Sequence, residues 1–378
     1  MIFSKNFVHR TCGEIIHPWN QNCFQAYMMM IRSATVGCSK LIFPIMLGHY
    51  IVKIKKSRFE KKHIKNFIID LLKMITFGVS ACVLFVAFNC LIRNLVGKFT
   101  LFTVCFIPGF LAGLSSLVLT NEYQNSVTII FCNASLESCI LKIRDSGIFF
   151  KNLKSETIFF MITNAFLMYF SQKSKIENFS WFYRPKNNAN KKNSEHDIRK
   201  KLFSNELNNK VKQYFIFGFA MGILRTIVGD ITILSHKRIH RLFKMRILKS
   251  GVFTASYVAI YELVFNFLCQ KYRNTSTNFA LLAGFLAGIP YAIDPILQIN
   301  VSAFINLIQI LYNMIHIDVL KKKKPIRVII FCLSLGVLCH FRFVLDKQFS
   351  KIGKKVIKTA TNGLSEVILD SFYKFNLM

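Results

Sequence analysis

Acidic side chains are scarce in this sequence, which has 18 Asp and Glu residues against 50 Lys and Arg residues and a formal net charge of +32. In a soluble protein, such a surplus of positive charge would indicate nucleic-acid binding. The sequence has no recognised nucleic-acid-binding motif, however, and its basic residues stand between apolar blocks, as they do in the loops of membrane proteins. We therefore expect the positive charge to face a membrane surface, and we expect no nucleic-acid partner.

The sequence also lacks the motifs of common active sites. The phosphate-binding pattern G-x-x-x-x-G-K-[ST], the metalloprotease pattern H-E-x-x-H and the nucleophile pattern G-x-S-x-G are all absent. No catalytic residue and no cofactor is predicted, and we do not expect an enzyme. A secretory signal peptide is not expected either, because no apolar core directly follows Lys5, His9 and Arg10.

Paired cysteine motifs are missing too. The chain has 11 cysteines, an odd number, and contains no C-x-x-C pattern. Cysteines within apolar blocks usually behave as small buried hydrophobic residues, so a disulfide framework is not expected. Eight of the cysteines have this setting: Cys82, Cys90, Cys105, Cys132, Cys139, Cys269, Cys332 and Cys339.

Long apolar blocks, in contrast, are abundant. Hydrophobic residues make up 53% of the 378 positions, with 39 Phe residues, and the mean hydropathy is +0.38. A helix needs ~20 mostly apolar residues to cross a bilayer. The candidate spans are 34–52, 74–92, 99–119, a more polar block at 126–143, 156–170, 213–234, 248–269, 279–299, 301–317 and 326–345.

These blocks are apolar on all sides, whereas a transmembrane strand would alternate apolar and polar residues. Within hydrocarbon, a helix satisfies its own backbone hydrogen bonds. We therefore predict an all-α fold, a polytopic transmembrane helix bundle with roughly eight to ten spans. Four prolines are expected to kink or break helices: Pro44, Pro108, Pro290 and Pro295.

An internal repeat indicates two related halves. The run Gly-Phe-Leu-Ala-Gly at 109–113 recurs at 284–288, and Phe-Asn at 88–89 recurs at 265–266. Duplicated halves are common in transporters, but a membrane protein can also arise by duplication without transporting anything. The predicted domains are a cysteine-containing segment at 1–33, a first transmembrane half at 34–170, a basic linker at 171–212, a second half at 213–345 and a basic, amphipathic tail at 346–378.

Three pairs of glycines four residues apart are candidates for close helix packing. Glycines at this spacing make a flat groove that lets two helix backbones approach each other in a membrane. We expect packing within the chain more often than a partner interface. The pairs are Gly109 with Gly113, Gly218 with Gly222, and Gly284 with Gly288.

Ionisable residues within the apolar blocks form a second group of candidates. A charge at mid-membrane costs ~2.5–3.5 kcal/mol on insertion scales, so it usually faces a partner or water. These residues could line a polar path through the bundle, or they could form structural ion pairs. They are Glu137, Arg225, Asp230, Glu262 and Asp294.

The N-terminal segment concentrates side chains that can bind metal ions. Thiolate, imidazole and carboxylate groups bind zinc tetrahedrally, although the spacing here matches no standard zinc module. Three interpretations remain open: an ordered cap with free thiols, a disulfide between Cys12 and Cys23, and a metal site. The segment's candidate residues are Cys12, Glu14, His17, Trp19 and Cys23.

This N-terminal pattern, C-x-E-x-x-H-x-W-N-x-x-C, resembles the cysteine-rich amino-terminal region of the transmembrane protein 135 family. The runs 88–93 and 97–99 are similar to the exit of that family's second span, and 283–288 is similar to its carboxy-terminal A-G-F-L-A-G-I segment. The last segment is in turn similar to the inner-membrane translocase superfamily, which includes small peroxisomal membrane proteins. The resemblance covers roughly residues 12–317.

The resemblance implies a multi-pass protein of the peroxisomal or mitochondrial membrane, with roles in mitochondrial fission, peroxisome organisation and lipid or cholesterol homeostasis. The alternative that it implies is a protein or solute translocase. The expected partners are the lipid bilayer, a peroxisomal import receptor and the organelle-fission machinery; the oligomeric state is not predicted. No catalytic residue carries over, because the family has no defined activity.

Overall fold

The computed structural model describes residues 10–54, 61–100, 102–147, 152–174, 181–185, 205–229, 245–273, 276–314 and 324–374. Every regular element within these ranges is a helix, which confirms the all-α prediction. The chain divides into two compact units, residues 1–142 with 319–378, and residues 143–318. Each unit has its own buried core.

The first unit is built around two long helices. After the short α1 (Cys12–Ile15), α2 (Cys23–Ile54) packs along α3 (Lys61–Val96). The chain continues through a π-helical turn, η1 (Phe102–Phe106), into α4 (Ile107–Ala112), the 3-10 helix η2 (Gly113–Val118) and α5 (Asn121–Asp145). The later helix α13 (Lys324–Val344) packs against α4 and η2.

The C-terminal tail completes the core of the first unit. After η6 (Asp346–Gln348), helix α14 (Lys351–Ala360) packs against α2, and α15 (Leu364–Lys374) contacts α1 and α13. The side chain of Phe372 is only 1% exposed. The guanidinium of Arg342, also 1% exposed, forms ion pairs with Asp346 and Glu366. The residues predicted as an amphipathic tail therefore include structural helices.

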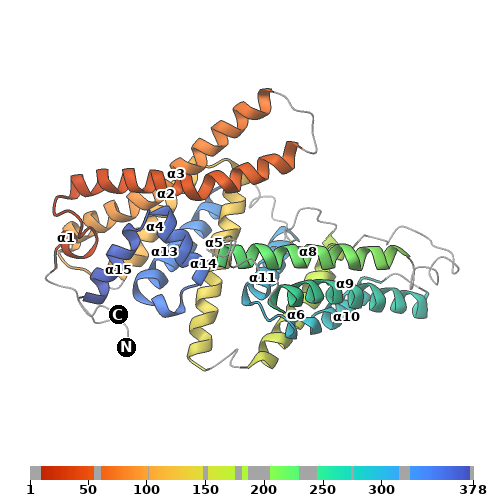
Figure 1. The fold of residues 1–378 in the computed structure, drawn as a ribbon. Coiled ribbons are helices and arrows are strands. Elements are labelled where there is room, and N and C mark those ends of the chain that lie inside the picture. The colour runs from red at the N-terminus through yellow and green to blue at the C-terminus, as the bar shows by residue number, and fades with distance from the viewer. Residues whose placement is uncertain are drawn as a thin grey trace. The chain divides into compact units, whose positions relative to one another are not determined.

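The second unit contains α6 (Leu153–Ser174), α8 (Asn205–Gly229), α9 (Met245–Tyr272), α10 (Thr277–Ala287), the 3-10 helix η5 (Ile289–Ala292) and α11 (Leu297–Met314). Helices α8 and α9 run side by side, and α6 packs against α10 and α11 (Figure 1). Trp181 and Tyr183, which belong to the predicted linker, are buried in this core. Their large apolar rings gain more by burial than by exposure to solvent.

The two units cut across the two halves indicated by the sequence repeat. We call the two Gly-Phe-Leu-Ala-Gly runs, 109–113 and 284–288, the Gly-rich motifs. Each one ends an α-helix, leads into a 3-10 helix and is followed by a further helix, α5 or α11. Helix α6 is the next described helix after α5, and α13 is the next described helix after α11, so α6 and α13 correspond to each other in the repeat. Yet α4 packs against α13, and α10 packs against α6. The last helix of each half therefore packs against the Gly-rich motif of the other half.

Among the described residues, five helices are long and apolar enough to cross a membrane by length and composition: 23–48, 63–96, 121–145, 247–272 and 325–344. This is fewer than the roughly eight to ten spans expected. The blocks at 99–119, 279–299 and 301–317 form shorter helices in the described structure, and those at 156–170 and 213–234 lie in α6 and α8, which are not among the five. Pro108 and Pro290 lie at the first positions of new helical segments, whereas Pro44 lies inside the continuous α2.

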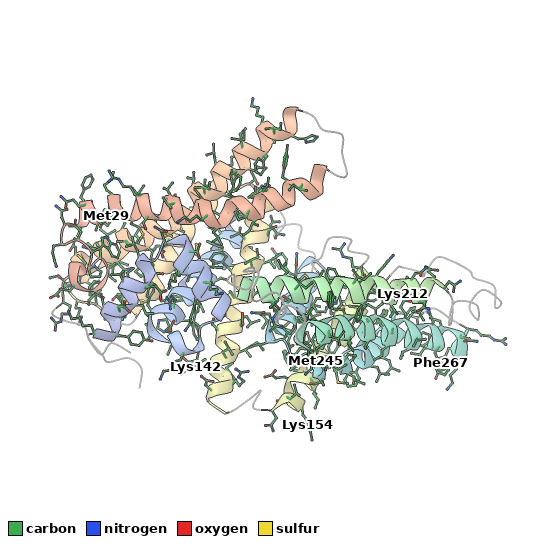
Figure 2. All side chains as sticks on the ribbon, in the orientation of Figure 1. Met29, Lys142, Lys154, Lys212, Met245 and Phe267 are labelled. Atoms are coloured by element: carbon green, nitrogen blue, oxygen red, sulfur yellow. The ribbon has the colours of Figure 1, made fainter. Side chains whose placement is uncertain are left out.

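Much of the surface of these five helices is apolar. Only 28% of the most apolar window of 63–96 is buried inside the protein. Met29 on α2 and Phe267 on α9 are 43% and 53% exposed and point away from their own units (Figure 2). A solvated soluble protein rarely exposes so many large apolar side chains in continuous patches, which indicates hydrocarbon as their surroundings.

Candidate functional site

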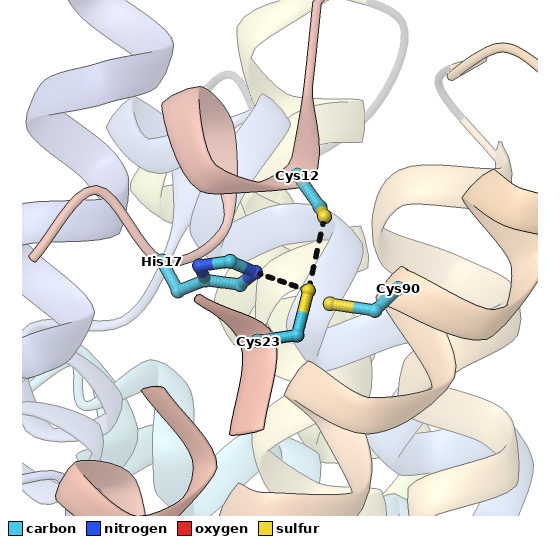
Figure 3. Close-up of side chains that lie close together, drawn as sticks. All are labelled: Cys12, His17, Cys23 and Cys90. Carbon is cyan, nitrogen blue, oxygen red and sulfur yellow. Dashed lines mark hydrogen bonds between the residues drawn. The ribbon is translucent and has the colours of Figure 1, made fainter. Parts of the chain in front are cut away.

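Three cysteines and one histidine come together in the first unit (Figure 3). The potential ligand atoms of Cys12, His17, Cys23 and Cys90 all lie within 4.8 Å of one another. The Sγ atoms of Cys12 and Cys23 are 3.5 Å apart, and the Cys23 Sγ lies 3.4 Å from Nε2 of His17. We call these four residues the Cys3His cluster.

Local structure at α1 positions Cys12. This cysteine is the first residue of α1, and the backbone N–H of Thr11 donates a hydrogen bond of 2.9 Å to Oε2 of Glu14. Arg10 lies 3.6 Å from the other carboxylate oxygen of Glu14. This capping arrangement satisfies a backbone group at the start of the helix. Glu14, a predicted site residue, therefore caps α1 and is not a member of the cluster.

The orientation of His17 is fixed by the turn that follows α1. The side chain is completely buried, and its Nδ1 lies 2.7 Å from the backbone carbonyl oxygen of Asn20. A carbonyl oxygen can only accept, so Nδ1 carries the proton and Nε2 presents its lone pair to the cluster. Trp19, also predicted from the sequence, lies edge-on to the imidazole with ring centroids 6.4 Å apart.

Cys23 and Cys90 come from the two long helices. Cys23 is the first residue of α2, where Oδ1 of Asn22 accepts a hydrogen bond of 3.0 Å from the backbone N–H of Phe24. Cys90 lies in the C-terminal half of α3 and is 3% exposed. One turn further along α3, Nε of Arg93 donates a 3.1 Å hydrogen bond to the carbonyl oxygen of Arg10. The start of the described chain is thereby tied to the end of α3.

Hydrogen bonding within the cluster changes the acidity of its members. The pKa of the Cys12 thiol is lowered to about 4, first by a hydrogen bond with Cys90 and second by one with His17, while burial opposes the change. Burial on its own lowers the pKa of His17, but hydrogen bonds to Cys12 and Asn20 outweigh it and raise the pKa. Cys12 is therefore the residue most easily present as a thiolate.

Sequence reasoning brought Cys12, His17 and Cys23 into one candidate site but missed Cys90. Residue 90 lies far from the other three in sequence and within an apolar block, and this setting predicts a buried hydrophobic residue and not a ligand. The run 88–93, already noted for its resemblance, contains this cysteine and was the signal that could have revealed it. All described cysteines are free thiols.

The predicted intramembrane charges do not form one path in the described structure. On α9, Glu262 accepts hydrogen bonds of 2.9 Å from the Tyr183 hydroxyl and from Nζ of Lys210. Asp294 accepts a 2.5 Å hydrogen bond from Ser250 and lies 4.0 Å from Arg225.

Of the two other predicted charges, Glu137 lies on α5 and Asp230 lies outside the described residues. Glu262 and Asp294 each have a cation nearby, as expected for charges placed in a low-dielectric interior. These contacts favour a structural ion-pair interpretation over a polar path.

All three glycine pairs lie against another helix of the chain. A Cβ atom added at Gly113 would lie 2.6 Å from Cα of Cys332 on α13, and one added at Gly288 would lie 2.7 Å from Cα of Met161 on α6. The remaining four glycines are similarly crowded, Gly109 by α13, Gly218 and Gly222 by α9, and Gly284 by α6. Small residues therefore permit these close helix contacts.

Comparison with known families identifies the N-terminal part of the chain. Residues 9–163 match the family described as the N-terminal cysteine-rich region of Transmembrane protein 135. Over these residues, the chain is similar to the transmembrane protein 135 family. All four residues of the Cys3His cluster lie within the matched region. No solved structure matches the chain.

The match to the transmembrane protein 135 family agrees with the five apolar helices found among the described residues, and the protein is a multi-pass membrane protein. The match ends at residue 163. The similarity of 283–288 to the translocase superfamily therefore stays a prediction.

Proposed function

We propose that this protein resides in the peroxisomal or mitochondrial membrane and acts in mitochondrial fission, peroxisome organisation and lipid or cholesterol homeostasis. The match to the transmembrane protein 135 family supports this proposal, because the resemblance implies those roles. The protein acts without catalysis, through partners or through its effect on lipids.

The exposed apolar surface of the spanning helices is the observation that carries the proposal. In three of the five candidate spans, no more than a third of the most apolar window is buried inside the protein. Leu72 on α3 and Ile130 on α5 are 58% and 62% exposed. Such side chains are stable in contact with lipid tails, so the protein presents a large surface to the lipids of its membrane.

The partners follow from the charge distribution and remain proposals. Basic residues flank several spans and favour an anionic membrane face. We propose that a peroxisomal import receptor recognises basic residues beside a span, including Lys324 at the start of α13. The fission machinery is the second proposed partner, and it would contact the protein outside the membrane.

A knockout followed by organelle imaging and lipidomics tests the function. Cells that lack the protein are expected to show altered mitochondrial length, peroxisome number and membrane lipid composition, and re-expression of the intact chain is expected to restore all three. Fractionation should find the protein in organelle membranes after alkaline extraction. Unchanged organelles and lipids in the complete absence of the protein would overturn the proposal.

A translocase is the second candidate, and the repeated helix–Gly motif–3-10 helix order favours it, because duplicated halves recur in transporters. Purified protein in sealed vesicles would then carry a solute or polypeptide across the bilayer. The variant Glu262→Gln removes the carboxylate between Tyr183 and Lys210 and is expected to slow such flux. Flux indistinguishable from that of protein-free vesicles rejects this candidate.

A further inference from the structure

We propose that the Cys3His cluster binds one Zn²⁺ ion in a closed structural site, with Sγ of each cysteine and Nε2 of the histidine as the ligands. The four ligands are Cys12, His17, Cys23 and Cys90.

The spacing of the donor atoms fits a single tetrahedral ion. Zinc bonds of ~2.3 Å to sulfur and ~2.0–2.1 Å to nitrogen place two sulfurs about 3.8 Å apart and a sulfur and a nitrogen about 3.6 Å apart. The observed distances are 3.5 Å between Cys12 and Cys23 and 3.4 Å between Cys23 and His17. Because all four atoms lie within 4.8 Å, they enclose one ion and are too close together for a multinuclear cluster.

The residues around the donors prepare His17 for metal binding. Its Nδ1–H donates to the carbonyl oxygen of Asn20 at 2.7 Å, so Nε2 is the free donor atom. This type of second hydrogen bond fixes the ring and its tautomer in most histidine metal sites. His17 is completely buried, and therefore its ring cannot turn towards solvent without opening the segment between α1 and α2.

The donor set selects zinc and a structural role. Three thiolates and one imidazole form a known zinc ligand combination, and four protein ligands leave no position open for water or substrate. Binding releases the protons that remain on the thiols and leaves a net charge of −1 on the ion and its three thiolates. Arg93, one turn beyond Cys90 on α3 and bonded to the carbonyl oxygen of Arg10, supplies a nearby compensating cation.

The ion would join parts of the chain that are distant in sequence. Cys12, His17 and Cys23 belong to the first turns of the described structure, whereas Cys90 lies near the end of α3. Zinc binding would therefore fasten the N-terminal segment to the end of the α2–α3 pair. A disulfide between Cys12 and Cys23 would remove two of the four donors, so the disulfide and the zinc site exclude each other.

Metal analysis of the full-length protein tests the proposal directly. The chain is purified under reducing conditions in lipid nanodiscs, without metal-affinity chromatography, and its zinc, iron and copper are measured by mass spectrometry. We expect about one zinc ion per chain, and a large loss of zinc in Cys12→Ser, His17→Ala and Cys90→Ser. The matched control is Cys82→Ser, which changes a cysteine on the same helix as Cys90 outside the cluster and should retain the ion.

A second measurement uses the wild-type protein, so its result does not depend on whether the variants fold. Zinc is removed from the intact wild-type protein with a chelator, and Co²⁺ is added in its place. We expect a thiolate-to-cobalt charge-transfer band and visible bands of tetrahedral cobalt, both displaced by Zn²⁺. Trp19, which lies beside His17, should lose fluorescence as cobalt binds.

Three outcomes would overturn the zinc proposal. The first is protein without metal that shows no cobalt spectrum although all of its thiols react with a thiol reagent. The second is a peptide map with a disulfide between Cys12 and Cys23 in protein from intact organelles. The third is retention of zinc in the Cys90→Ser protein together with loss of zinc in Cys82→Ser, which would place the ion elsewhere.

Discussion

Nδ2 of Asn164 on α6 donates a 2.5 Å hydrogen bond to the carbonyl oxygen of Gly284 on α10. The α-helical hydrogen-bond pattern ends here. In an α-helix the backbone N–H of Gly288 would donate to the carbonyl oxygen of Gly284, but it donates to that of Phe285 at the start of the 3-10 segment. Carbonyl groups in the last turn of a helix need partners from outside it. Asn164 supplies such a partner, and its own Oδ1 accepts a 2.5 Å hydrogen bond from the hydroxyl of Tyr257.

Replacing Asn164 with leucine should therefore destabilise the second unit. The change removes both hydrogen bonds and leaves a buried carbonyl and a buried hydroxyl without this partner, at a cost of about 1–3 kcal/mol. The midpoint of thermal unfolding in detergent is expected to fall. Asn208→Leu, at an exposed position on α8, is the matched control and should leave the midpoint unchanged. Equal midpoints for Asn164→Leu and wild type would contradict the role of this bond.

Gly288→Ala is expected to disrupt the contact between the Gly-rich motif and α6. The new methyl group would lie 2.7 Å from the Cα atom of Met161, so one of the two backbones must move. Overpacking of this kind costs about 1–3 kcal/mol. Gly48→Ala on α2 is the control, since no heavy atom lies within 4 Å of an added Cβ there. The predicted clash at Gly288 is contradicted if both alanine variants unfold at the same temperature as the wild type.

Arg342→Met should loosen the C-terminal helices. Arg342 is 1% exposed and pairs with Asp346 and Glu366, so its loss removes this cation from Glu366 and leaves Asp346 paired with Lys354. Removing one partner from a buried pair costs about 3–5 kcal/mol, and the partial exposure of Glu366 places the expected cost near the lower end. Limited proteolysis should then cut between α14 and α15 faster. The exposed Lys347→Met serves as the control.

The acidity of Cys12 predicts an unusual pH profile of alkylation in chelator-treated protein. Its pKa is lowered to about 4, so the thiol is already ionised at pH 6 and the alkylation rate should be nearly constant from pH 6 to pH 8. In the unfolded chain, with a thiol pKa near 8.5, the rate should rise roughly 80-fold over the same range. Mass spectrometry of the Cys12 peptide measures both rates.

The same shift makes the stability of the metal-free protein depend on pH. A thiol whose pKa is lower in the folded protein than in the unfolded chain stabilises the fold at pH values above its pKa in the unfolded chain. This contribution to stability is lost as the pH falls towards about 4. A Cys12 alkylation rate that rises as steeply in the folded protein as in urea would contradict the lowered pKa.

The N-terminal cluster shows how far sequence reasoning reached into the site. Cys12, His17 and Cys23 can be grouped from the sequence because they lie in one short segment, whose turns can bring their side chains near one another. Cys90 was missed because its contact with them depends on how α3 packs beside α2. A cysteine in an apolar helix has the same local sequence whether it is a ligand or a packing residue.

The sequence by itself determined that this protein is helical and embedded in a membrane, because long apolar blocks must satisfy their backbone hydrogen bonds internally. Only the tertiary structure decided which helices pair. Blocks that are apolar on every side carry no single buried face, so their partners are chosen by small residues that permit close approach, such as Gly113 against α13 and Gly288 against α6. Long-range packing of this kind places α13 against the Gly-rich motif of the first half and α6 against that of the second half. Long-range packing also brings Cys90 to the N-terminal cluster.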